Sequence, residues 1–299
     1  MVDFVKAVTD DQLYINRLFN YATSNLRPHK SQNNNYEAYS NDLGRFRLEF
    51  RKVYSVGELI GFRNVEVCFS PHYRFNNDLH NGNKFRPLDS CKIIRTVFLG
   101  LDITESEMLD FKVVNLEYGI NLQTGINIET LINGLLFTNK TPFQTRNFPF
   151  FKISQSTKFK EIKAYAKGLQ FEDFPQYGID RDTFRFEVRT KKTEKIKTLG
   201  ISNVGDLTNP DKYSPLFQSI LDEWENVLII NNLAKSIHNS LEFWQNLKDH
   251  TDRNKFTKTK AKYYQNLESK NNLHLIIKMK IIDKIIELQK GADCPQKTP

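Results

Sequence analysis

Alternating apolar and polar side chains mark the clearest predicted strands of the chain. Residues 43–53 place Phe46 and Phe50 on one face, with charged side chains between them. Residues 64–70 and 113–122 alternate in the same way. Successive side chains of a strand point to opposite faces, so this period of two predicts half-buried strands.

Two further alternating stretches, residues 161–168 and 183–191, flank a loop that contains Pro175 and Gly178. Apolar residues three and four apart predict helices elsewhere, namely at residues 10–24, 88–99, 105–111, 127–136 and 210–230. Strands and helices come in blocks rather than in regular βαβ alternation. The sequence therefore predicts an α+β fold with a mainly antiparallel sheet flanked by helices.

A short internal match raises the hypothesis that this sheet is duplicated. Residues 46–51 read Phe-Arg-Leu-Glu-Phe-Arg and residues 184–189 read Phe-Arg-Phe-Glu-Val-Arg, with four of six positions identical. The two hexapeptides are candidates for equivalent strands of a repeated unit. Chance similarity in an aromatic-rich chain is the alternative.

Three consecutive segments are expected along the chain. Residues 1–40 have the composition of a polar, partly helical leader, residues 41–230 hold the α+β domain, and residues 231–299 form a basic helical C-terminal region. Residues 273–288 are too apolar for a solvated helix, so this helix must pack. The first candidate partner is a helix at residues 233–247, whose apolar face is formed by Leu233, Ile237, Leu241 and Trp244. A second copy of the chain, as a homodimer, is the other candidate.

Composition limits the class of protein. Of 299 residues, 39% are hydrophobic and 12% aromatic, enough to bury a core. No apolar run reaches the roughly 18 residues of a membrane span, and the chain does not start like a secretory signal. Cys68, Cys91 and Cys294 lie far apart without CxxC spacing, which argues against a disulfide scaffold or a four-cysteine zinc site. We expect a soluble cytoplasmic protein with no membrane partner.

Positive charge is concentrated near the C-terminal end. The chain has a net charge of +8, and residues 231–299 carry 13 Lys+Arg against 7 Asp+Glu. Within them, five cations without an acid precede two tyrosines; they are Arg253, Lys255, Lys258, Lys260 and Lys262. Cations bind phosphates and aromatic rings stack on bases, so this segment is a candidate DNA-binding surface. A solvated helix face or a solubilising tail is the alternative.

A second group of polar residues lies on the predicted strands. Alternation places Lys163, Tyr165 and Lys167 on one face of the first strand. It places Arg185, Glu187 and Arg189 on one face of the second. If the apolar faces of both strands cover one core, these polar side chains share the opposite surface. The result would be a tyrosine among cations, with a carboxylate beside it.

Such a group suits the transfer of a DNA phosphate to tyrosine. A phenol has a pKa near 10, so its attack requires cations or a metal ion that favour the phenolate. Glu117, on the polar face of its own strand, supplies a second carboxylate for Mg²⁺ or Mn²⁺. Cross-strand ion pairs around an ordinary strand tyrosine are the alternative. No P-loop, GxGxxG, GxSxG or HExxH motif is present, which argues against nucleotide hydrolysis, hydride transfer and zinc proteolysis.

The order of these motifs resembles that of rolling-circle replication initiators. A Tyr-x-Lys strand containing Tyr165 is followed by an Arg-x-Glu strand containing Glu187, as in the trans-acting plasmid Rep family and the gene II replication proteins of filamentous phages. Residues 68–85 look like the Ser-x-His/Lys and Gly-x-Asn segment of the phage proteins. Residues 115–121 are similar to their Arg-x-Asp strand followed by an Asn. The resemblance extends over about residues 43–230.

The resemblance implies an activity. Tyr165 would nick single-stranded or supercoiled origin DNA and form a 5′-phosphotyrosine intermediate, as a metal-dependent single-strand endonuclease and ligase that starts replication of a plasmid or phage. Glu117 and Glu187 would bind Mg²⁺ or Mn²⁺, with His72 and His80 as further candidate ligands. A host helicase or polymerase would be a partner.

This chain departs from the family pattern at several positions. The Glu expected after Tyr-x-Lys is missing, and Asn115 and Glu117 replace the expected Arg and Asp. Tyr177, in the loop after the Tyr-x-Lys strand, is a rival nucleophile.

The alternative function is a non-catalytic DNA-binding initiator, or recruitment protein, of a plasmid or phage. We predict that Tyr165, Glu187 and Glu117 lie on one solvent-facing surface. An exposed Tyr165 beside carboxylates would favour the enzyme. A Tyr165 in the core would count against its role as the nucleophile and favour the DNA-binding protein.

Overall fold

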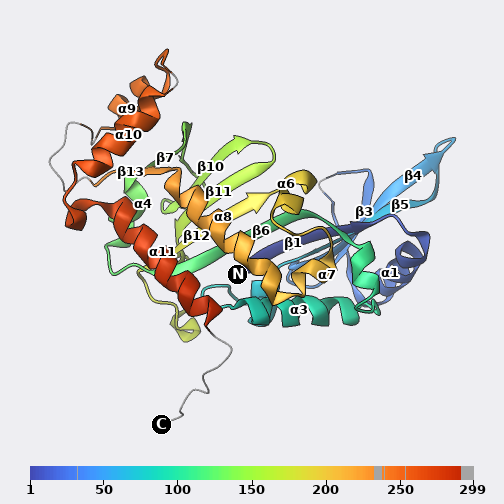
Figure 1. The fold of residues 1–299 in the computed structure, drawn as a ribbon. Coiled ribbons are helices and arrows are strands. Elements are labelled where there is room, and N and C mark those ends of the chain that lie inside the picture. The colour runs from blue at the N-terminus through green and yellow to red at the C-terminus, as the bar shows by residue number, and fades with distance from the viewer. Residues whose placement is uncertain (32, 232–237, 239, 253, 291–299) are drawn as a thin grey trace, which may run out of the picture. The chain divides into compact units, whose positions relative to one another are not determined.

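The structure is a computed structural model that describes residues 1–31, 33–231, 238, 240–252 and 254–290. It is an α+β fold with a ten-stranded antiparallel sheet, a three-stranded sheet and a helical C-terminal region, as predicted (Figure 1). None of the helices in these residues is both long and apolar enough to cross a membrane.

The large sheet has five strands on each side of its centre. Its order is β2 (Arg27–His29), β3 (Tyr36–Ser40), β4 (Phe46–Ser55), β5 (Glu58–Phe69), β1 (Val2–Thr9), β6 (Lys112–Gln123), β12 (Thr183–Thr190), β11 (Lys160–Ala166), β10 (Phe151–Thr157) and β9 (Gln144–Thr145). The strictly alternating stretches predicted from the sequence became β4, β5, β6, β11 and β12.

The two sides repeat one strand order, which is what a duplicated sheet would have. Each begins at a central strand, β1 or β6, continues into a helix, α1 (Gln12–Asn25) or α4 (Ile128–Gly134), and moves to the sheet edge. From the edge the chain runs back toward the centre, each strand beside the one before, until β5 pairs with β1 on one side and β12 with β6 on the other. The matching hexapeptides lie on β4 and β12, whereas the strand equivalent to β12 is β5. The prediction that they are equivalent strands is therefore wrong.

The polar leader predicted at residues 1–40 is also wrong at its beginning. Val2–Thr9 is β1, which pairs with both β5 and β6 in the middle of the sheet. Lys6 interrupts the apolar pattern of this strand, but its ammonium group is 3.3 Å from Glu49 and also contacts Glu66. A charge paired in this way is tolerated in a central strand.

The chain forms two compact units, each built from several stretches rather than from one continuous segment. Unit 1 holds residues 1–81, 85–118 and 189–216. In it, Phe19 of α1 packs on Phe50 and Phe62 of the sheet, with ring centroids 5.3 and 4.9 Å apart. Its other helices are α2 (Pro71–Phe75), α3 (Pro87–Leu99), η1 (Glu107–Asp110), α6 (Thr193–Thr198), α7 (Val204–Leu207) and η3 (Pro210–Tyr213).

Unit 2 holds residues 82–84, 119–188 and 217–299. It contains the small sheet, ordered β13 (Val227–Ile229), β7 (Leu135–Thr138) and β8 (Thr141–Pro142), and most of α8 (Ser214–Glu225). Trp224 of α8 packs on Phe184 and Phe186 of β12, with ring centroids 6.1 and 5.2 Å apart. Short helices α5 (Lys167–Gln170) and η2 (Pro175–Tyr177) lie between β11 and β12.

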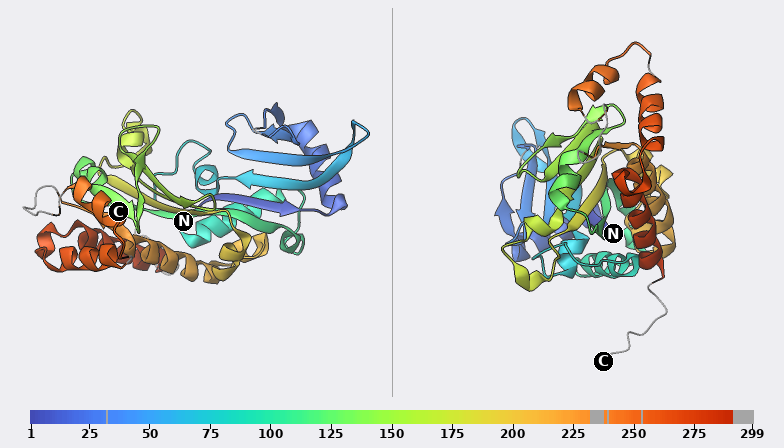
Figure 2. Two further views of the ribbon diagram at one scale, coloured as in Figure 1. Left: turned by 90° about the horizontal axis from the view of Figure 1, so that it is seen from above. Right: turned by 90° about the vertical axis from the view of Figure 1, so that its left-hand side faces the viewer.

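Three helices and a short turn follow in unit 2: α9 (Leu241–Lys248), α10 (Lys255–Gln265), η4 (Ser269–Asn271) and α11 (Leu273–Gln289). The last helix packs within the chain, as expected. Its neighbours differ from the prediction, because α11 packs against β13 and Trp224, on the same side of β10–β12 as α8 (Figure 2). Trp244 of α9 instead contacts Phe256 of α10. The predicted face residues Leu233 and Ile237 lie outside the described residues.

Candidate functional site

Tyr165 and Glu187 meet on neighbouring strands β11 and β12. The Tyr165 hydroxyl donates a hydrogen bond of 2.8 Å to the Glu187 carboxylate. The same carboxylate binds the Arg185 guanidinium, and its second oxygen is 3.5 Å from Lys163 Nζ. We call these four residues the Tyr165 cluster. The predicted common face for Tyr165 and Glu187 is thus confirmed.

Strand alternation explains why these side chains converge. Phe184 and Phe186 point to the face that Trp224 covers. Arg185 and Glu187 alternate with them along β12 and so point to the other face. On β11 the small residues Ala164 and Ala166 alternate with the polar members of the cluster in the same way.

The predicted solvent-facing surface is wrong, because Tyr165, Glu187 and Arg185 are buried and Lys163 is partly buried. Tyr165 is 4% exposed, Glu187 2% and Arg185 1%. The Tyr165 ring packs on Phe151 of β10, with centroids 4.5 Å apart. Two cations share the carboxylate, so the buried charges compensate one another instead of facing water. Burial is the outcome expected of the DNA-binding alternative, whereas the hydrogen bond is the geometry of a nucleophile and its base.

Lys167 is buried beside the cluster rather than displayed to solvent. Its Nζ lies 5.2 Å from the centroid of the Tyr165 ring and 4.8 Å from that of Phe171. The ammonium group also donates to Gln170 at 2.9 Å. Lys167 therefore fixes the first turn of α5 against the tyrosine.

Asn121 of β6 joins a further segment to the cluster. Its side-chain oxygen accepts from Arg185, and its amide nitrogen donates to the backbone oxygens of Gly82 at 2.8 Å and Asn83 at 3.1 Å. Gly82 and Asn83, in the segment that resembles Gly-x-Asn, are thereby linked to Glu187 through the side chains of Asn121 and Arg185. Sequence reasoning gave Asn121 no role, although its place on the polar face of β6 was a usable signal.

Glu117 belongs to unit 1, where its contacts are with Arg189. The Arg189 Nε atom is 3.7 Å from a Glu117 oxygen and donates to Asn115 at 3.2 Å. Glu117 is 8% exposed, so the prediction that it faces solvent is wrong as well. An arginine already compensates its charge, which also explains its burial.

The two candidate histidine ligands lie in unit 1. His72 is 1% exposed, its Nδ1 is 3.3 Å from an Asp3 oxygen, and its ring stacks on Phe85 with centroids 4.4 Å apart. His80 accepts a hydrogen bond from Asn76 through its backbone oxygen. The contacts of the His72 ring are those of a buried structural histidine.

The predicted ligands do not fit Mg²⁺ or Mn²⁺ in this arrangement. Arg185 and Lys163 take up the charge of Glu187, and Arg189 takes up that of Glu117. A divalent cation requires carboxylates whose charge is still available. Glu117 and Glu187 are therefore not metal ligands in this arrangement.

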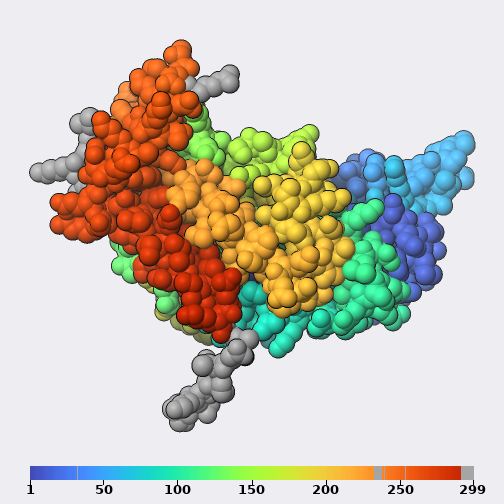
Figure 3. Space-filling view, viewed as in Figure 1, coloured from blue at the N-terminus to red at the C-terminus, as the bar shows by residue number. Residues whose placement is uncertain are grey.

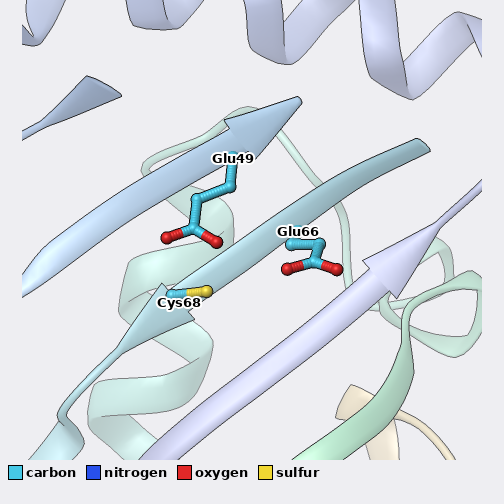
Figure 4. Close-up of side chains that lie close together, drawn as sticks. All are labelled: Glu49, Glu66 and Cys68. Atoms are coloured by element: carbon cyan, nitrogen blue, oxygen red, sulfur yellow. The ribbon is translucent and has the colours of Figure 1, made fainter. Parts of the chain in front are cut away.

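A different set of side chains, in unit 1, is close enough to hold a metal ion. Glu49, Glu66 and Cys68 place ligand atoms within 4.8 Å of one another, the one such group in the described residues (Figure 4). Lys6, however, contacts both glutamates. Burial also raises the pKa of the Cys68 thiol to about 12, so it stays protonated. Lys6 thus supplies the positive charge here, and we call these four residues the Lys6 cluster.

Tyr177, the rival nucleophile, belongs to an aromatic group on the loop after β11. Its ring stacks on Phe174 with centroids 5.4 Å apart and meets Phe171 edge-on at 5.7 Å. Phe174 is 44% exposed. These contacts assign Tyr177 a packing role in the loop.

The basic segment is mostly, but not wholly, exposed. Phe256 and Tyr263 bury one side of α10, which leaves Lys255, Lys258 and Lys262 at the surface. Lys260 differs, because its Nζ donates to the Glu225 backbone oxygen at 2.7 Å and burial lowers its pKa. Lys260 is therefore held by a contact within the protein. Arg253 lies outside the described residues.

Comparisons with known proteins add no family to this picture, since a scan against protein-family models gives no match and a search of the curated proteins gives none either. Support for a function therefore comes from the geometry of the Tyr165 cluster and from the order of the motifs.

Proposed function

We propose that this protein starts rolling-circle replication of a plasmid or phage by cutting and rejoining one DNA strand through Tyr165. The observation that carries the proposal is the 2.8 Å hydrogen bond from the Tyr165 hydroxyl to Glu187, beside two cations. A nucleophile needs a base within hydrogen-bonding reach, and an attacked phosphate needs positive charge nearby.

In the cutting step, Glu187 accepts the phenolic proton while the Tyr165 oxygen bonds to the phosphorus atom. The bond from phosphorus to the 3′ oxygen breaks, and that oxygen takes up a proton from solvent and leaves as a 3′ hydroxyl. Arg185 and Lys163 stabilise the negative charge that develops on the phosphoryl oxygens. Attack of a 3′ hydroxyl on the phosphotyrosine reverses the step, joins the strand and restores the phenol.

Burial of Tyr165 requires that DNA displace neighbouring side chains before the phosphate reaches it. The same burial favours the second candidate, a DNA-binding initiator that recruits a helicase or polymerase without nicking. The two candidates differ in one product, a covalent bond between protein and DNA.

The test incubates wild type, Tyr165→Phe and Tyr177→Phe with labelled single-stranded and supercoiled DNA of the replicon that encodes the chain. We expect a covalent adduct on denaturing gels with wild type and Tyr177→Phe, and none with Tyr165→Phe. An adduct that still forms in the presence of a metal chelator would agree with carboxylates that are already paired with cations. DNA binding without an adduct in wild type would identify the non-catalytic protein, and an adduct lost only in Tyr177→Phe would move the nucleophile.

A further inference from the structure

A polar cavity of about 490 Å³ lies within unit 2, next to Asn121. The end of β6, the start of β12, residues 82–84, residues 178–180 and one side of α11 form its walls. Its volume falls within the roughly 300–1,000 Å³ of small-molecule sites. α11, which forms one wall, lies at the protein surface (red in Figure 3), and the cavity is partly open to solvent.

In one wall of the cavity, the backbone of Gly82 packs closely on the side chain of Ile179. A Cβ atom on Gly82 would lie 2.1 Å from the Ile179 side chain, so any other residue at position 82 would force Ile179 to shift. Asn121 then holds the backbone oxygens of Gly82 and Asn83 by hydrogen bonds. The wall is therefore a fixed part of the unit.

Positively and negatively charged side chains line the cavity in equal number. Lys84, Lys280 and Lys284 line it together with Asp180, Asp283 and Glu287. Glu287 pairs with Lys84 and Lys284, whereas Lys280 and Asp283 form no ion pair within the described residues. Lys280 thus remains available to a ligand, as do Asp283 and Asp180, of which Asp180 also accepts a hydrogen bond from Gln123.

This combination suits a whole nucleotide better than a bare anion. The phosphate of a nucleotide matches the ammonium group of Lys280, and the N–H donors of a base edge match the carboxylates of Asp283 and Asp180. An inorganic anion or a duplex backbone would gain from the lysines and be repelled by the acids. Bases are accessible in this way only in a single strand.

Asn121 connects the cavity to the candidate nucleophile. It lines the cavity and bonds to Arg185, which holds the carboxylate that Tyr165 contacts. We propose that the cavity binds one nucleotide of single-stranded DNA beside the phosphate that Tyr165 attacks, with Lys280 on its phosphate and Asp283 on its base. This inference rests on the proposed function for its position, but not for its ligand.

The test measures binding of a fluorescein-labelled, single-stranded octanucleotide and of a hairpin duplex to Lys280→Ala and Asp283→Asn. Lys290→Ala, an exposed lysine just beyond α11, is the matched control. We expect each cavity variant to bind the octanucleotide about tenfold more weakly, with duplex binding unchanged. Deoxynucleoside monophosphates should compete with the octanucleotide better than inorganic phosphate.

Equal octanucleotide affinity of Lys280→Ala and Lys290→Ala would overturn the inference, and so would equal competition by phosphate. Circular dichroism and melting temperatures establish that the variants are folded. If the adduct forms through Tyr165 but Lys280→Ala binds normally, the inference fails and the proposed function stands. If no adduct forms but the cavity variants lose binding, the proposed function fails and the binding of a nucleotide in the cavity stands.

Discussion

Acidification should destabilise the packing of α11, because a buried neutral histidine must then take up a proton. His274 is 7% exposed and lies between the rings of Trp224 and Tyr264. Its Nε2 donates to the Trp224 backbone oxygen at 3.0 Å, so the other ring nitrogen carries no proton in the neutral form. Burial lowers its pKa from the usual 6.5 to about 4, with Lys260 and Lys278 acting in the same direction, whereas the hydrogen bond to Trp224 and the charge of Glu225 oppose the shift more weakly.

The sign follows from proton uptake by the two states. The unfolded chain protonates His274 below about pH 6.5, and the folded chain only below about pH 4. Between these values the unfolded chain binds more protons, so the free energy of unfolding falls as the pH falls. The loss should reach about 2 kcal/mol at pH 5 and about 3 kcal/mol at pH 4.

Urea unfolding at pH 7 and pH 5, followed by tryptophan fluorescence, measures this loss. His274→Phe keeps an aromatic ring between Trp224 and Tyr264 but cannot titrate, so it serves as the reference. Wild type should lose about 2 kcal/mol more than the variant between the two pH values, whatever their difference at pH 7. Equal losses would refute the argument, since His274 would then titrate alike in both states.

Two further predictions concern charged side chains. Lys6→Met leaves Glu66 without its cation and Glu49 with Arg47 alone, and it should lower the free energy of unfolding by roughly 3 kcal/mol in urea titrations. Added Zn²⁺ should restore part of this loss, whereas a variant as stable as wild type would show that Lys6 compensates nothing. Replacement of Lys255, Lys258 and Lys262 by Ala should weaken binding to any DNA sequence and lower the slope of log affinity against log salt by about two to three. An unchanged slope in fluorescence anisotropy would exclude α10 from the DNA interface.

Alternation was sufficient to predict the strands that carry the candidate site. It placed Tyr165 and Glu187 on one face because side-chain direction depends only on position along a strand. It could not predict their burial, which depends on what covers that face, here Phe151 and the charges that pair with Glu187. Part of the charge pairing that excludes a metal ion has the same origin, since Lys163 pairs with Glu187 and Arg189 with Glu117 across neighbouring strands.

Elements without a regular apolar pattern could not be predicted from the sequence. β1 reads as polar because Lys6 interrupts it, and the glutamates that make Lys6 acceptable lie on β4 and β5. Strands of two to four residues, such as β8 and β13, are too short to show alternation. Lys260 looked like its neighbours on α10, and only the position of Glu225 distinguishes it.

The central position of β1 has a consequence for folding during synthesis. β1 is made before both of its partners, because Val5 pairs with Phe69 of β5 and Val2 pairs with Tyr118 of β6. Pairings so distant in sequence form slowly, and until then the strand presents open edges on which other chains can add. A positive charge in the middle of a bare strand opposes such aggregation. Lys6 would thus protect the nascent chain until the glutamates of β4 and β5 arrive to neutralise it.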